Sequence, residues 1–187
     1  MKKILIILMT VLALTAFTAC ESKDVEIAEE TTTVTSEKAE IFKGTGYTLV
    51  VDSEKWVFDS ENSIAEDDAL FFYTHDMISL FKVKMTEMDG QKVFDMSIFD
   101  DNFRTLYDEK DKSSYLGGEV INVNGYDCFK GRFSAVGYVE DEVVLYNQYV
   151  ILNGNSMYNF ICMSSEQMFD SVCSDFEEVL NTISFVE

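Results

Sequence analysis

The chain has 187 residues, of which 34 are acidic and 14 are Lys or Arg, so its formal net charge at pH 7 is -20. Nucleic-acid binding depends on clustered Lys and Arg, and a field of this sign repels a phosphate backbone. We therefore expect no nucleic-acid partner. Hydrophobic residues make up 47% of the chain, which is sufficient for a folded core.

The first 19 residues have the layout of an export signal. Lys2 and Lys3 precede an apolar run over residues 4–17, and Thr18 and Ala19 are small residues suited to a cleavage point. These are the three parts of a signal peptide. The run is shorter than the about 20 apolar residues of a membrane-spanning helix. We predict that residues 1–19 are a signal peptide.

Residues 17–20, Phe-Thr-Ala-Cys, resemble a lipobox, the recognition element of bacterial prolipoproteins, although that element prefers Leu or a smaller aliphatic residue where Phe17 stands. The resemblance implies that Cys20 becomes the first mature residue and carries diacylglycerol on its sulfur. Two acyl chains hold a protein stably on a membrane. The expected location is the extracytoplasmic face of a cell membrane. The alternatives are an ordinary secretory signal cleaved near Ala19 and an uncleaved anchor.

Residues 20–40 are acidic and Thr-rich and contain no aromatic residue, which predicts a disordered linker. Residues 41–187 have the length of one domain. This domain holds Cys128, Cys162 and Cys173, an odd number, so at least one thiol is free or pairs between molecules. Each lies where a small apolar residue would suit, and we expect three core thiols. A disulfide between Cys162 and Cys173 is the alternative.

Aromatic and β-branched runs between turn residues predict the strands of the domain. They are expected at residues 47–51, 55–58, 70–73, 78–85, 119–123, 126–135, 143–152 and 157–163, with a short last strand at 184–186. The four strands from residue 119 to residue 163 form an antiparallel meander whose first turn, Asn124-Gly125, is a type I′ signal. Residues 59–68 are expected to be a polar loop, and His75 to lie at the apex of a hairpin.

Two stretches follow the helical period. The first comes after Asp95, an expected N-cap, and covers residues 96–107. The second is expected to begin at Ser164 or Ser165, because residues 164–167 fit a capping box. Four acidic residues of this helix are expected to face solvent: Asp170, Asp175, Glu177 and Glu178. Its expected apolar stripe is Met168, Phe169, Val172, Cys173, Phe176, Val179, Leu180 and Ile183.

The order of these elements resembles the Mog1/PsbP-like fold. The features are Gly-Tyr-Thr-Leu-Val-Val at residues 46–51, the pair Lys55-Trp56, a hairpin, a helix, the Asn-Gly-Tyr meander, an amphipathic helix and a closing Ile-Ser-Phe. The family usually has a proline before the Trp region, and this chain has none. The resemblance implies an α+β fold with an antiparallel β-sheet sandwiched by helices. Members of this fold mostly act as binding modules.

Catalytic and cofactor motifs are absent from the sequence. The single histidine, His75, is expected in a solvated turn, away in sequence from any serine or cysteine nucleophile. The zinc motifs C-x-x-C and H-E-x-x-H do not occur, and the acidic clusters at residues 66–68, 100–101 and 140–142 lack the alternating pattern of a calcium loop. We expect no enzyme activity, no cofactor and no metal.

The expected function is that of a membrane-anchored lipoprotein whose domain is a non-catalytic protein-interaction module for an envelope or secreted protein. The alternative is a solute- or ion-binding lipoprotein with an acidic cleft. Trp56, Tyr138 and Tyr146 are candidates for lining a carbohydrate or peptide groove, although core packing is the commoner use of such residues. Convergent polar groups without partners in a pocket would favour a solute, and a flat exposed apolar patch would favour a protein.

Overall fold

The computed structural model describes residues 38–65, 69–77, 79–88, 97–107, 113–136 and 143–186. The predicted signal peptide, Cys20 and the linker up to residue 37 lie outside them. In chain order the elements are β1 (Ala39–Gly44), β2 (Tyr47–Asp52), β3 (Trp56–Phe58), α2 (Ser60–Ala65), β4 (Ala69–Thr74), β5 (Leu80–Glu87), α3 (Ser97–Tyr107), β6 (Ser113–Val123), β7 (Tyr126–Val136), β8 (Val143–Asn153), β9 (Ser156–Ser165), α4 (Phe169–Leu180) and β10 (Ser184–Phe185). Within these ranges no helix has the length and hydrophobicity to cross a membrane.

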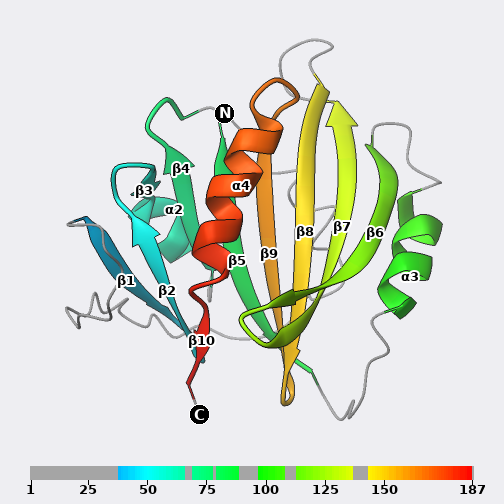
Figure 1. The fold of residues 1–187 in the computed structure, drawn as a ribbon, viewed down its shortest axis with the longest axis horizontal. Coiled ribbons are helices and arrows are strands. Elements are labelled where there is room, and N and C mark those ends of the chain that lie inside the picture. The colour runs from blue at the N-terminus through cyan, green and yellow to red at the C-terminus, as the bar shows by residue number, and fades with distance from the viewer. Residues whose placement is uncertain are drawn as a thin grey trace.

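The strands form two antiparallel sheets. The larger has seven strands in the order β3-β4-β5-β9-β8-β7-β6, and the smaller has three in the order β1-β2-β10. The predicted meander is confirmed as β6 to β9, and its Asn124-Gly125 turn has positive φ at both residues. Figure 1 shows α4 crossing the front of the large sheet over β5 and β9, and α3 beside β6.

Alternation along β7 explains how the large sheet packs against helices on both faces. Cys128 belongs to the core cluster that α4 covers, whereas Phe129 and Phe133 pack with Phe103 of α3. At the centre of the α4 core, the Phe176 ring lies 4.9 Å from the ring of Phe81 between centroids. The sheet is therefore sandwiched between helices, as the resemblance implied.

The predicted start of the last helix is wrong. Ser164 and Ser165 end β9, where they pair with β8, and α4 begins at Phe169 after Met168, with no side-chain cap. The Ser164 hydroxyl lies 2.7 Å from the Ser79 hydroxyl in the interior, so it is not available for a capping box. Sheet pairing therefore overrides the local capping signal. Met168, predicted on the apolar stripe, is 44% exposed.

Two elements lie outside the predicted pattern. β1 pairs with β2 through six register pairs from Ala39 onward, two residues before the expected start of the domain. α2 occupies part of the expected polar loop, because Asp59 organises its first turn. The Asp59 carboxylate accepts a 3.0 Å hydrogen bond from the Asn62 amide, and the Asp59 carbonyl accepts one of 2.6 Å from the Ser63 hydroxyl. Side-chain capping of this kind stabilises even a short helix.

Candidate functional site

A groove of about 560 Å³ lies between α4 and the face of the large sheet formed by β6, β7 and β8. Figure 1 shows why the sheet is accessible there: α4 crosses β5 and β9 and leaves the front of β7 and β6 without a covering helix. This volume lies within the about 300 to 1,000 Å³ of ligand pockets. The groove is therefore large enough for a small molecule or a short stretch of peptide.

The sheet side of the groove places cations beside amide and backbone groups. Lys130 and Arg132 are two residues apart on β7, so both side chains point to the α4 face. Arg132 pairs directly with Asn147 of β8. On the other side Arg132 pairs with Gly117 of β6, next to a register shift after Tyr115. The shift places Gly117, in place of Leu116, opposite Arg132, and both residues line the rim of the groove.

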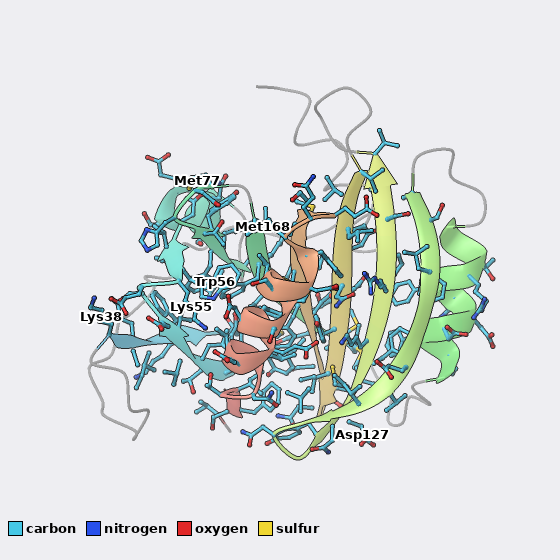
Figure 2. The ribbon with its side chains drawn as sticks, turned by 45° about the horizontal axis from the view of Figure 1, so that its top comes forward. Lys38, Lys55, Trp56, Met77, Asp127 and Met168 are labelled. Carbon is cyan, nitrogen blue, oxygen red and sulfur yellow. The ribbon has the colours of Figure 1, made fainter. Side chains whose placement is uncertain are left out.

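The helix side of the groove is one face of α4. Asp170, Cys173, Ser174 and Glu177 line it, at the i, i+3, i+4 and i+7 spacing of a single face. Glu177 is therefore not simply solvent-facing as predicted, because it turns into the groove. Lys55 binds the opposite flank of α4 through Asp175 and Glu178, and these contacts raise the pKa of its ammonium group. Figure 2 shows Lys55 beside that flank.

A chain of hydrogen bonds connects the groove with the sheet interior. Oε1 of Glu177 accepts from Nζ of Lys130 at 2.7 Å and from the Tyr149 hydroxyl at 2.8 Å. Nδ2 of Asn147 donates to the Tyr149 oxygen at 3.1 Å and to Sγ of Cys173 at 3.5 Å. Burial raises the pKa of Tyr149 far above its usual value, so its hydroxyl stays protonated. The network thus holds the Asn147 amide in one orientation.

Asn147 carries the unusual feature of this site. Its side chain is 3% exposed, and Oδ1 has no hydrogen-bond partner among the residues that the structure describes. The Tyr149 hydroxyl has one proton, which goes to Glu177, so the amide must present its nitrogen to Tyr149. Oδ1 is therefore the atom left over. An unsatisfied buried acceptor costs about 1 to 3 kcal/mol.

Arg132 supplies N–H donors that form no hydrogen bond with the residues that the structure describes. Its guanidinium lies 4.8 Å from the centroid of the Phe169 ring, and Nη2 is 3.7 Å from the carboxylate of Asp170, beyond hydrogen-bond distance. The side chains of Arg132 and Asp170 are 47% and 93% exposed, and exposed pairs of this kind contribute about 0 to 1 kcal/mol. The ring therefore positions the guanidinium while its N–H groups remain open to a ligand.

The three cysteines are buried free thiols, as expected. Cys173 borders the groove, while Cys128 and Cys162 lie deeper in the α4 core. Burial raises the pKa of Cys128 to about 12. Contact with the Cys173 sulfur and burial together raise the pKa of Cys162. Cys128 and Cys162 are therefore neutral at physiological pH, and a neutral thiol is a poor nucleophile.

The other candidates from the sequence lie away from the groove. His75 is exposed at the apex of the β4–β5 hairpin, with Nε2 3.2 Å from the carbonyl oxygen of Ser53. Trp56 and Tyr146 are buried in the two cores, and Tyr138 is outside the described residues. In the described ranges no three His, Cys, Asp or Glu side chains are placed to hold a metal ion. The acidic clusters at 66–68 and 140–142 lie outside those ranges.

Asp100, from the remaining acidic cluster, has a structural role. Its carboxylate accepts hydrogen bonds from the Tyr115 hydroxyl and from Nε of Arg104, and the Tyr115 bond is the main cause of its lowered pKa. These contacts attach α3 to β6 on the face of the sheet opposite the groove. Asp100 therefore belongs to the packing of α3 and not to the candidate site.

No protein-family model and no curated protein matches the chain. Among solved structures, the cyanobacterial PsbP (CyanoP) of Synechocystis sp. PCC 6803 is similar at a TM-score of 0.56 and 16% identity, over 84% of this chain and 98% of that one. A Bacteroides thetaiotaomicron protein has a TM-score of 0.52 and 14% identity, over 80% of this chain and 48% of its own. A Pseudomonas aeruginosa protein of unknown function, PA94, has a TM-score of 0.51 and 8% identity, over 80% and 98%.

These identities establish the architecture alone. The chain has a PsbP-like α+β fold, and the fold expected from the order of its elements is confirmed.

The groove residues belong to no motif that marks them as a site in the sequence. Asn147 and Gln148 interrupt an otherwise apolar strand, and two adjacent polar residues inside a buried strand are the signal that was available. Lys130 and Arg132, two basic residues on one strand of a very acidic protein, are a second signal. Neither indicates which helix lies opposite.

Proposed function

We propose that the protein is a lipoprotein held at the extracytoplasmic face of a cell membrane through Cys20, and that its domain is a non-catalytic protein-interaction module. The signal layout of residues 1–19 and the cysteine that follows it support the anchor. The groove between α4 and β6–β8 is the observation that carries the binding role. In the described part of the chain its buried Asn147 oxygen has no partner, and its Arg132 guanidinium has only Asp170, at 3.7 Å, as an ion-pair contact.

The chemistry of the groove suits binding better than catalysis. Lys130 and Glu177 are bonded to each other, and Tyr149 is held protonated by burial. His75, the chain's single histidine, bonds to the backbone of Ser53 at the far hairpin. A nucleophile needs a base within about 3 Å. The Tyr149 hydroxyl has Glu177 at 2.8 Å, but burial keeps this hydroxyl protonated, which suits a hydrogen-bond donor better than a nucleophile.

A second candidate function, solute binding, is favoured by the same unpartnered Asn147 oxygen. The charges of the groove differ from those of the expected acidic cleft. Glu119, Asp170 and Glu177 line it together with Lys130 and Arg132, so the surface is mixed in charge. Mixed charge favours a ligand that carries both a negative group and hydrogen-bond donors over a free cation.

Blocking the groove tests the interaction role. Ser174 lies on the groove face of α4, and Ser171 is exposed on another side of the same helix. We expect full-length protein with Ser174→Trp, cross-linked in its own cell envelope and purified through a tag, to lose the partner that wild type and Ser171→Trp both retain. Equal capture of the partner by all three proteins would show that the interaction surface lies outside the groove. Capture of no partner by any of them would refute the proposal of an interaction module.

A further inference from the structure

We infer that the groove binds the free carboxyl end of a peptide chain, with Arg132 holding the carboxylate and Oδ1 of Asn147 accepting a hydrogen bond from an amide N–H of the same end. The inference rests on the proposed function and names the chemistry of the partner segment. It combines a free anion-binding group, a free acceptor and an open path for the rest of the ligand.

The anion-binding group is the Arg132 guanidinium. A planar guanidinium matches a carboxylate through two parallel hydrogen bonds. The Phe169 ring 4.8 Å away supports one side of the guanidinium, and the nearest acid, Asp170, is 3.7 Å away and almost fully exposed. A ligand carboxylate can therefore replace Asp170 at little cost, since so exposed a pair contributes little to stability.

The acceptor lies next to this group. Arg132 and Asn147 are directly opposite across β7 and β8, and opposite Cβ atoms in an antiparallel pair are about 4.5 to 5.5 Å apart. The last residue of a peptide has its carboxylate and its amide N–H on either side of one Cα atom. A site that binds both groups therefore needs a guanidinium for the carboxylate and, beside it, an acceptor for the N–H. Because Oδ1 is buried, the side chains that cover it must shift as the ligand enters.

Charge selects a singly negative ligand. The groove is lined by three carboxylates, from Glu119, Asp170 and Glu177, and by two cations, from Lys130 and Arg132. A phosphate group carries about two negative charges at pH 7 and is disfavoured there. One carboxylate on an otherwise neutral backbone suits this balance.

Shape selects an elongated ligand. The groove extends to the rim strand β6 at Gly117, whose φ is +115° and above which a side-chain carbon would meet no heavy atom within 4 Å. The register shift after Tyr115 places a glycine opposite Arg132, so position 117 adds no side chain to that edge, where Leu116 and Glu119 also line the groove. The residues that precede a bound carboxyl end therefore have an exit across β6.

Two pools of N-acetylated hexapeptides with randomised residues, one ending in a free carboxylate and the other in a carboxamide, test the inference by calorimetry and NMR on the full-length protein in detergent. We expect the free-acid pool to bind at least about tenfold more tightly, the loss expected when one charged hydrogen bond of about 1.5 to 3 kcal/mol is removed. Arg132→Gln should lose the same factor, and Arg132→Lys should retain part of the affinity.

Arg104→Gln is the matched control, because Arg104 lies on α3 at the other face of the sheet. Asn147→Leu should weaken the free-acid pool while thermal melts show a folded protein. Equal binding of both pools, or no binding of either at millimolar concentration, overturns the inference, and if Ser174→Trp still loses its partner the interaction module remains intact. If free amino acids bind as tightly as the free-acid pool, the inference that the ligand is the end of a peptide chain is overturned.

Discussion

Asn147 is a residue whose burial works against stability. Its amide is oriented by Tyr149 and Cys173, and the remaining oxygen is buried with no partner within the described ranges. Apolar side chains of similar volume avoid this cost, as Leu145 and Ile151 do on the same face of β8. A polar residue at this position is therefore explained better by a ligand than by the fold.

We predict that Asn147→Leu leaves the free energy of unfolding within about 1 kcal/mol of wild type or raises it, because the unsatisfied acceptor disappears while the side-chain volume is kept. Urea denaturation measures this. Asn147→Asp is the contrasting variant, since it buries a charge and should cost several kcal/mol. A loss above about 2 kcal/mol in the leucine variant would mean that the amide is structural.

Residue-level prediction succeeded where burial alone decides. The three cysteines of the domain occupy positions where a small apolar residue would suit, and all three are buried thiols. It failed for Asn147 and Arg132, because their role in the groove depends on the register between β7 and β8 and on the position of α4. Neither relation is contained in the local pattern of either strand.

At the level of elements, α4 connects the two sheets. Its apolar side covers the large sheet, and immediately after it the Thr182 hydroxyl accepts a 2.8 Å hydrogen bond from the Val50 amide of β2. β10 then pairs with β2. The apolar stripe from Phe169 to Ile183 was predictable from its helical period. The start of the helix was not, because Ser164 and Ser165 pair with β8 as the last residues of β9.

We predict that Phe176→Ala lowers the free energy of unfolding by about 3 to 5 kcal/mol, the usual cost of truncating a buried phenylalanine. The Phe176 side chain is fully buried, with its ring 4.9 Å from Phe81 and 5.3 Å from Tyr149 between centroids. Ser171→Ala, on the exposed side of α4, should change it by less than about 0.5 kcal/mol. Chemical denaturation followed by circular dichroism compares the two, and a Phe176→Ala loss below about 1 kcal/mol would contradict this packing.

At the scale of the whole molecule, the alternating strands and two helical stretches were sufficient to predict an antiparallel sheet between helices. The separate three-stranded sheet was not predictable, because its first strand, β1, is six residues long, follows directly on the acidic linker and has only Ile41 and Phe42 as large apolar residues. Pairing with β2 and the burial of Phe42 give that segment its structure. Long-range pairing of this kind leaves only a weak local signal.

We predict that Cys20→Ala removes the lipid and releases the protein from the membrane, since the thioether has no other acceptor at the signal boundary and residues 4–17 are too short to span the bilayer well. Detergent phase partitioning and mass spectrometry of the N-terminus measure this. Cys128→Ala, which removes a buried thiol of the domain, is the control and should remain lipidated. A wild-type mature terminus other than modified Cys20 would contradict the anchor.

The place where the chain enters the domain has a mechanical consequence. Ala39 begins β1 at the open end of the β1–β2 hairpin, opposite Asp52, and Figure 1 shows β1 on the side of the molecule away from β6. Lys38, labelled in Figure 2, adds an ion pair to Glu54 at that end. A pull on the preceding residues would therefore break the six β1–β2 pairs one after another. Force applied there would strip the outermost strand of the small sheet before it strained the groove between α4 and β6–β8.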